Sequence, residues 1–348
     1  MRRPPVPIVG GLDIHRKQLT FDYLDIDSGQ LRRGQLAPAD RSHLAAWLRR
    51  FDGVDEATFA VEACTGWRYV VEELRRAGMR VQLAEPADTA AARGRKKRAK
   101  TDRADSKLLR ELACEGRVPQ CWIPPSVVLE NRALLECYHD LRREHTAWIQ
   151  RIHATCFHQG TAVLGAISTS DDVQRLRQTA ATQLSPAGRV QIAVALAMLE
   201  TLDTHLDAVR RRLLDVARRL HGAKILAERL YGVGPVTALA MCCWLGGAGR
   251  FSSSRQAVRF TGLDITVYSS DGKRSPGHLS RQGPPVLRWC VYEAGKTHAR
   301  SSAPDHDYYA TVKDRVDGKR AAISEARKLV RQAYHILDEL GDAAFTTA

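Results

Sequence analysis

The fold of the N-terminal region is decided by residues 6–36, VPIVGGLDIHRKQLTFDYLDIDSGQLRRGQL. An apolar run ends near Asp13, an alternating run follows it, and Ser28-Gly29 separates that run from a third extended segment. Alternation with a period of two is typical of strands that bury one face, and Gly-containing pairs are typical of the turns between them. We therefore expect a three-stranded meander, with Asp13 at the end of its first strand.

The next segments alternate between helical and extended patterns. The sequence predicts helices over residues 38–51, 66–77 and 101–116, and strands over residues 57–64 and 79–86. A basic loop, GRKKRAK, occupies residues 94–100 and precedes the last of these helices. Three strands followed by helix, strand, helix, strand and helix is the order of an α/β ribonuclease H-like (RuvC-like) domain.

Four carboxylates fall where the first strand, the fourth strand and the last helix of such a domain converge. They are Asp13, Glu62, Asp102 and Asp105. The last two are three residues apart, so both share one face of the first helical turn. Four converging carboxylates repel one another unless a hard divalent cation binds them, and we therefore expect a Mg²⁺ (or Mn²⁺) site. The alternative is that each is a helix cap or a surface charge.

The charge of the chain favours a nucleic acid as its partner. Its 348 residues carry a net charge of +14, and Arg, the more abundant basic residue, can form paired hydrogen bonds with phosphate. The candidate contacts near the carboxylates are Arg95, Lys96, Lys97, Arg98, Lys100 and Arg103. No segment reads as a signal peptide or as a membrane span, so we expect a cytoplasmic protein without a membrane partner.

The middle of the chain has the repeat of a coiled coil. Apolar positions follow alternating steps of three and four over residues 134–152 and again over residues 199–220, a pattern typical of a helix-packing seam. A polar stretch over residues 160–186 separates the two, so we expect a long helical hairpin. The seam does not distinguish packing within one chain from a dimer interface.

A change of composition at His221-Gly222 predicts a further boundary. LYGVGPVTALAM, residues 230–241, then reads as a helix, a Gly-containing turn and a second helix, similar to a helix-hairpin-helix segment. Gly232 and Gly234 would let main-chain N–H groups approach a phosphate at the start of the second helix. A tight structural turn would require the same glycines.

Several motifs together resemble one family. They are GLDIHRKQ (residues 11–18), VEACTGWRY (61–69), KTDRADSKLL (100–109), LYGVGPVTALAM, GRFSSSRQAVRFTGL (249–263), YSSDGKRSPGHLSRQGPPVLRW (268–289) and YYATVKDRVDGKRAAISEARKLV (308–330). In this order they resemble the DEDD-type insertion-sequence transposases, the family of the Piv and MooV DNA invertases, also called bridge-RNA-guided serine recombinases. The resemblance covers nearly the whole chain.

The resemblance implies three domains and a second set of catalytic residues. The domains are a RuvC-like DEDD catalytic domain (1–125), a helical coiled-coil region (126–221) and a mainly α-helical C-terminal transposase domain (222–348). The family's nucleophilic serine aligns with Ser270, although Asp271 stands where the family usually has Gly and Ser269 is the alternative nucleophile. Lys273 and Arg274 would then bind the phosphate.

The implied reaction is a DNA strand exchange by transesterification. Ser270 would attack a phosphodiester, form a phosphoserine link and release a DNA hydroxyl, with metal-binding carboxylates assisting. The implied partners are donor and target DNA, a non-coding guide RNA and further copies of the chain, as a homodimer that assembles into a tetramer in a bacterial nucleoid. Two alternatives remain: a RuvC-like nuclease, such as a junction resolvase, that activates water, and a non-enzymatic nucleic-acid-binding protein.

Overall fold

The structure, a computed structural model, divides the chain into two compact units, residues 1–123 and 124–348, which are described separately. It describes residues 8–54, 56–93, 101–161, 165, 167–265, 268–270, 273–275 and 277–347. None of the helices in these ranges has the length and apolar character needed to cross a membrane. The basic loop of residues 94–100 lies outside the described residues.

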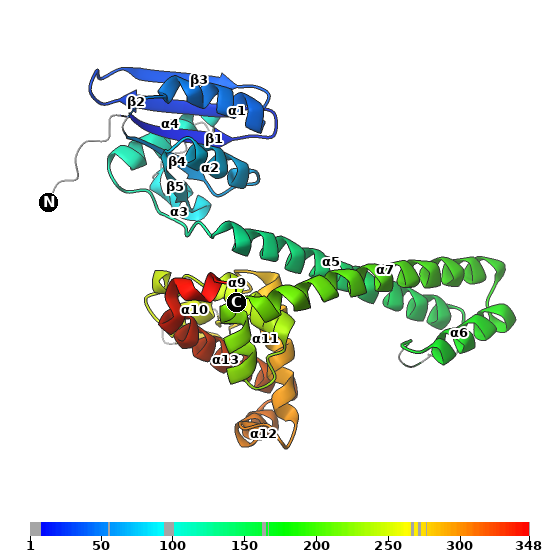
Figure 1. Cartoon of the computed structure of the whole chain (residues 1–348). Coiled ribbons are helices and arrows are strands. Elements are labelled where there is room, and N and C mark those ends of the chain that lie inside the picture. Colours follow the sequence, from blue (N-terminus) through cyan, green and yellow to red (C-terminus); the bar gives the residue numbers. More distant parts are fainter. Residues whose placement is uncertain are drawn as a thin grey trace. The chain divides into compact units, whose positions relative to one another are not determined.

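A mixed five-stranded sheet forms the centre of the first unit (Figure 1). Its strands are β1 (Ile8–Ile14), β2 (Leu19–Asp25), β3 (Leu31–Leu36), β4 (Ala57–Glu62) and β5 (Arg80–Ala84), in the order β3-β2-β1-β4-β5. The first three strands pair antiparallel, and β4 joins β1 and β5 in parallel. The predicted meander and ribonuclease H-like order are therefore confirmed.

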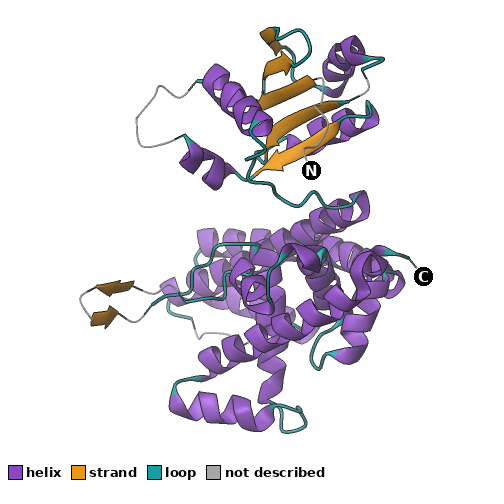
Figure 2. Ribbon diagram, turned by 90° about the vertical axis from the view of Figure 1, so that its left-hand side faces the viewer, coloured by secondary structure: helices purple, strands orange, loops and turns teal. Residues whose placement is uncertain are grey.

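Helices cover both faces of this sheet (Figure 2). They are α1 (Arg41–Leu48), the 3-10 turn η1 (Arg49–Phe51), α2 (Trp67–Arg76), α3 (Pro86–Ala92) and α4 (Asp102–Cys114). On one face, α1 and α2 bury their apolar sides against strand residues such as Leu12 and Phe59. On the other, Leu109 and Leu112 of α4 pack against Ala60 and Ala84. Of these helices, only α3 was not predicted.

A long helical hairpin opens the second unit, as predicted. It consists of α5 (Ser126–His158) and α7 (Pro186–Arg219), which pack along each other, with Leu199, Leu202 and Leu206 of the predicted seam buried. The connecting stretch contains a helix that was not predicted, α6 (Ser170–Gln183). A capping box starts it, in which the side chains of Thr169 and Asp172 each accept a bond from the other's main chain.

A helical bundle follows the hairpin. It contains α8 (His221–Arg229), α9 (Pro235–Leu245), η2 (Ala248–Arg250), α10 (Ser254–Phe260), α11 (Pro285–Lys296), η3 (Thr297–Ala299), α12 (His306–Arg315), α13 (Gly318–Leu340) and η4 (Gly341–Phe345). Its central helix is α9, whose residues 238–245 are all buried, against α5, α7, α8, α11 and α13. The predicted domain boundary at His221 stays a prediction, because hairpin and bundle share one compact unit.

Two short strands accompany the bundle, β6 (Tyr268–Ser270) and β7 (Lys273–Ser275), visible as the small hairpin in Figure 2. They pair antiparallel, with Ser270 opposite Lys273 and Ser269 opposite Arg274. Residues 271 and 272 lie outside the described residues. The isolated bridge between Ile265 and Leu279 joins the chain on either side of this hairpin.

Candidate active site and metal centre

The first candidate site lies where β1, β4 and α4 meet. Gly11 makes this meeting possible, because a Cβ atom there would lie 2.2 Å from the main-chain oxygen of Ser106 and 2.6 Å from the nitrogen of Arg110 in α4. Asp13 follows two residues later, so its side chain leaves the sheet on the same face as α4. Close packing of α4 on β1 therefore brings Asp13 to the first turn of that helix.

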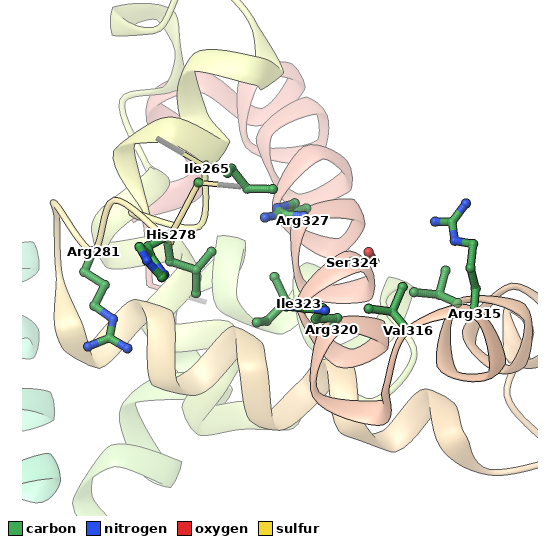
Figure 3. Close-up of a pocket in the computed structure, with 12 residues that line it drawn as sticks. Ile265, His278, Arg281, Arg315, Val316, Arg320, Ile323, Ser324 and Arg327 are labelled. Atoms are coloured by element: carbon green, nitrogen blue, oxygen red, sulfur yellow. The ribbon is translucent and has the colours of Figure 1, made fainter. Parts of the chain in front are cut away.

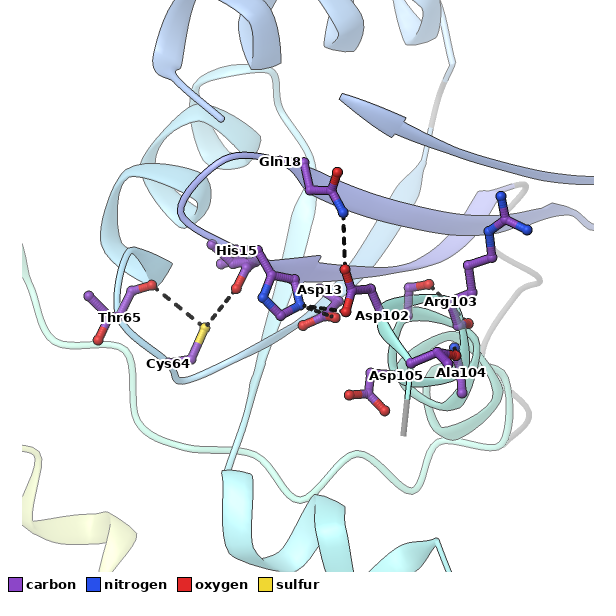
Figure 4. Close-up of polar contacts among 12 residues, drawn as sticks. Asp13, His15, Gln18, Cys64, Thr65, Asp102, Arg103, Ala104 and Asp105 are labelled. Carbon is purple, nitrogen blue, oxygen red and sulfur yellow. Dashed lines mark hydrogen bonds and ion pairs between the residues drawn. The ribbon is translucent and has the colours of Figure 1, made fainter. Parts of the chain in front are cut away.

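Asp13 and Asp102 are joined by a histidine (Figure 4). Nε2 of His15 lies 3.0 Å from Oδ2 of Asp13 and 3.1 Å from Oδ1 of Asp102. Gln18 donates from Nε2 to the second oxygen of Asp102 at 3.0 Å. One ligating atom from each of Asp13, His15 and Asp102 lies within 4.8 Å of the others, close enough for all three to bind one ion.

Asp105 lies near Asp13 but has a partner of its own. Its Oδ1 is 2.6 Å from Nη2 of Arg93, the C-cap residue of α3. The helix cap of α4 is Thr101, whose side chain accepts from the N–H of Ala104. Neither Asp102 nor Asp105 is therefore needed as the cap, which removes one alternative explanation for an acidic residue at this position.

Glu62 ends β4, next to the end of β1. The last paired residues of these parallel strands are Leu12 and Val61, so Asp13 and Glu62 each follow directly at the same edge of the sheet. Both carboxylates also act on the thiol of Cys64: burial, followed by the charges of Glu62 and Asp13, raises its pKa to about 11. The half-buried Glu62 thus belongs to the same acidic region.

Burial makes the charge on Asp13 costly. Only 4 % of Asp13 is exposed, and this burial raises the pKa of its carboxyl, as do the charges of Asp105 and Asp102, whereas His15 lowers it. Carboxylate oxygens are the ligands that Mg²⁺ and Mn²⁺ prefer. The donor set therefore fits a hard divalent cation, whose charge would offset the repulsion among these groups.

Comparisons with known proteins agree with this arrangement. Residues 10–159 match a family described as "Transposase", of the DEDD type found in IS110 elements. Residues 225–310 match the "Transposase IS116/IS110/IS902 family", so the two matches together cover more than half of the chain. The chain belongs to the IS110/IS116/IS902 family of transposases.

A relative from Pseudomonas aeruginosa strain PAO1 is similar along most of its length. It is described as "Probable family 20 transposase" and is 25% identical over 312 residues, which cover 85% of this chain and 86% of the relative. Membership of the family shows a transposase with a DEDD nuclease domain, which implies a divalent metal and DNA binding.

The turn before α9 contains two glycines, Gly232 and Gly234, and only Gly232 is required by the packing of the bundle. Gly232 adopts a φ of +75°, and a Cβ atom there would lie 2.0 Å from Oγ1 of Thr297, so both conformation and packing require glycine. Gly234 has no atom near its Cβ position and forms the N-cap of α9. The exposed start of α9 is therefore open to a ligand, and the predicted phosphate contact stays a prediction.

A cavity of about 670 Å³ lies next to the segments that lead into and out of the β6–β7 hairpin (Figure 3). Its lining includes Ile265 and Leu279, which bridge those segments. Four arginines contribute to it: Arg281, Arg315, Arg320 and Arg327. Burial lowers the pKa of Arg327, whose Nε donates to the main-chain oxygen of Leu263 at 2.8 Å.

His15, Arg93 and the arginine cavity were not predicted from the sequence. His15 had a detectable signal, because it follows Asp13 by two residues and an extended chain places both side chains on one side. Arg93 and the cavity had no detectable signal in the sequence, because their roles depend on tertiary contacts.

Of the predicted nucleic-acid contacts, Arg103 is exposed on α4. Residues 94–100 and the side chains of residues 269, 270, 273 and 274 are not described.

Proposed function

We propose that this transposase cuts and rejoins DNA through the hydroxyl of Ser270, assisted by Mg²⁺ or Mn²⁺. Its metal ligands are proposed to be Asp13, Glu62, Asp102 and Asp105. The observation that supports this most is the meeting of Asp13 and Asp102 around His15, at the sheet edge where Glu62 also ends. Such a donor set suits a phosphoryl-transfer site.

The proposed reaction conserves the energy of the phosphodiester. The oxygen of Ser270 attacks phosphorus, a Ser–O–P bond forms, and the DNA oxygen leaves as a free hydroxyl. A second DNA hydroxyl then attacks the phosphoserine and releases the serine, so no ATP is required. A bound divalent cation would neutralise phosphate charge and favour the ionised nucleophile.

The basic residues are proposed to hold the nucleic acid backbone. Lys273 and Arg274 pair in register with the two candidate serines, Ser270 and Ser269. The arginine cavity next to this hairpin, the loop of residues 94–100 with Arg103, and the start of α9 supply further phosphate contacts. Sequence selection is assigned to a non-coding guide RNA, and the active assembly to a homodimer that pairs into a tetramer.

A covalent-adduct assay tests the nucleophile. Full-length protein with Mg²⁺ is incubated with labelled DNA from the ends of its own element, and the DNA–protein adduct is mapped by mass spectrometry. We expect a phosphoester on Ser270, its loss in Ser270→Ala and its retention in Ser269→Ala. Asp102→Asn should reduce adduct formation at least about 100-fold. The control Glu111→Gln, a partly exposed carboxylate on the same helix, should behave as wild type.

The alternatives predict different outcomes in this assay. If Ser270→Ala still cuts DNA while Asp102→Asn does not, water is the nucleophile and the protein acts as a resolvase-like nuclease. If both variants bind DNA as wild type does and no protein cuts, the non-enzymatic alternative holds.

The guide RNA is tested by sequencing RNA that copurifies when the protein is expressed with its flanking DNA. A discrete species complementary to the flanks is expected, whereas heterogeneous RNA alone would remove the guide from the proposal.

A further inference from the structure

A second cluster of ligating side chains lies in the C-terminal bundle, at a position separate from the DEDD residues in the sequence. His298 in η3, Asp305 just before α12 and Glu325 in α13 each offer one ligating atom, and these atoms all lie within 4.8 Å of one another. None of the three has a part in the proposed strand exchange. A role for this cluster is therefore independent of the proposed strand exchange.

Two members of the cluster are buried without hydrogen-bond partners. His298 is 1 % exposed and Glu325 is 0 % exposed. Within the described residues, neither ring nitrogen of His298 and neither carboxylate oxygen of Glu325 has a partner with good hydrogen-bond geometry, although the main chain of Tyr231 lies near enough to His298 to oppose the effect of burial on its pKa. Buried polar atoms of this kind cost free energy unless another group satisfies them. A missing partner is therefore expected at this point of the bundle.

The spacing indicates what kind of partner is missing. Nδ1 of His298 lies 3.6 Å from Oε2 of Glu325, which is too long for a hydrogen bond. Two ligands at about 2.1 Å from a tetrahedral ion lie about 3.4 Å apart. The two atoms are thus spaced like neighbours on one metal ion.

Burial acts against charge on both residues when no ion is present. It raises the pKa of Glu325 and lowers the pKa of His298. Neutral imidazole is the form that binds metals, so burial already favours the ligating form of His298. For Glu325, the charge of Lys328 offsets the effect of burial only in part, and a bound cation would supply further compensation.

Lys328 is the cation already next to the cluster. Its Nζ lies 2.6 Å from Oδ1 of Asp305, and its side chain is 39% exposed. Asp305 has a second oxygen with which it can bind an ion. A metal at this site would therefore have to bind against the charge of Lys328, which makes this lysine a competitor that substitution can remove.

We propose that His298, Asp305 and Glu325 bind one divalent transition-metal ion, Zn²⁺ in preference to Mg²⁺, that ties η3 and the start of α12 to α13. Zn²⁺ accepts a nitrogen ligand together with carboxylate oxygens, and water would complete its four-coordinate shell. Mg²⁺ prefers oxygen ligands and retains several waters, which suits a buried imidazole site poorly. Three protein ligands leave one position for water, but His298 and Glu325 are buried and the three ligands come from separate elements, so the role assigned to this ion is structural.

Metal titration of the full chain tests the site. The Asp13→Asn, Asp102→Asn double variant is used, so that the DEDD residues do not contribute. We expect one Zn²⁺ per chain by calorimetry and a rise in the apparent Tm that Mg²⁺ does not reproduce. Bound Co²⁺ should show the visible bands of nitrogen and oxygen ligation, without the thiolate band that binding to exposed Cys114 or Cys137 would give.

Substitutions separate this site from accidental binding. Glu325→Gln and His298→Gln should each lose the Zn²⁺ stoichiometry, whereas His335→Gln and Glu339→Gln, both exposed on α13, should keep it. Lys328→Met should bind Zn²⁺ at least about tenfold more tightly, because a competing positive charge is gone.

If Glu325→Gln and His298→Gln fail to fold, Lys328→Met still tests the site. Lys328 is partly exposed, and its replacement keeps all three proposed ligands. The proposal is overturned if neither the double variant nor the same protein with Lys328→Met binds Zn²⁺ stoichiometrically. It is also overturned if Mg²⁺ stabilises the protein as well as Zn²⁺ does, or if Co²⁺ binds only through thiolates.

Discussion

Asp13 is the residue at which burial and charge oppose each other most directly. Burial raises its pKa above the ordinary value, so the folded protein binds a proton at this carboxyl more tightly than the unfolded chain does. The stability that this residue contributes is therefore complete below the pKa of the unfolded chain and is lost as the pH rises through the folded pKa. At pH 7 an ionised Asp13 makes the metal-free protein less stable.

The substitution Asp13→Asn should accordingly stabilise the metal-free protein at pH 7. We expect the apparent Tm in EDTA to rise by roughly 2 to 4 °C, the size of change that about 1 kcal/mol produces in a domain of moderate length. The difference should shrink as the pH falls through the raised pKa of the native carboxyl. Thermal unfolding of both proteins over this pH range, with and without Mg²⁺, measures the effect, and Mg²⁺ should stabilise only the wild type strongly.

Asp25 on the neighbouring strand β2 is the control, because its pKa is shifted in the opposite direction to that of Asp13. A hydrogen bond from the main chain of Ser28 lowers its pKa, so Asp25→Asn should not stabilise the protein at pH 7. A lower Tm for Asp13→Asn at pH 7 in EDTA would contradict the prediction. It would mean that the contact with His15 outweighs the cost of burial.

At the scale of elements, the close approach of α4 to β1 places the carboxylates. Gly11→Ala would put a methyl group against main-chain atoms of Ser106 and Arg110, which side-chain rotation cannot relieve. We expect the free energy of unfolding of the first unit to fall by about 2 to 3 kcal/mol, together with a loss of Mg²⁺-dependent stabilisation. Chemical denaturation followed by circular dichroism measures the first effect.

Gly249→Ala, in the second unit, is a control for the change from glycine to alanine itself. Gly249 lies in η2, has no positive φ and has nothing within 4 Å of its Cβ position. Its replacement should change stability little. If Gly11→Ala were equally harmless, α4 would have room to move, and the position of Asp102 would not depend on this contact.

Helices α3 and α6 show what the pattern of apolar residues misses. Start signals were present for both: Pro86 follows the capping Glu85, and Thr169 with Asp172 forms a capping box. The helices themselves are short or polar, so no apolar periodicity marked them. They form because tertiary packing stabilises them, as in the burial of Leu176 against α7.

For the whole molecule, the net charge of +14 predicts strongly salt-dependent DNA binding. Affinity for random-sequence duplex should fall by roughly 1,000-fold between about 50 and 200 mM salt if six or more phosphates are contacted. Replacing both Arg315 and Arg320 of the arginine cavity by Ala should lower the slope of log Kd against log salt by up to about 2. Fluorescence anisotropy at several salt concentrations measures it.

Arg117→Ala is the control for this measurement, because Arg117 is exposed and already paired with Glu115 at 2.7 Å. Its removal should leave the slope unchanged. An unchanged slope for the variant lacking Arg315 and Arg320 would show that the cavity does not contact phosphate, and would leave the DNA contacts to other basic segments.

The sequence by itself determined the order of strands and helices in the first unit, apart from α3, and the positions of the acidic residues at strand and helix ends. Local periodicity carries that information, because a strand alternates and a helix repeats within a few residues. Only the tertiary structure decided that His15 joins Asp13 to Asp102, that Arg93 pairs with Asp105, and that His298 and Glu325 are buried together. Most of these contacts join residues on different elements, and all depend on how closely backbones approach and how much water they exclude, which no local pattern encodes.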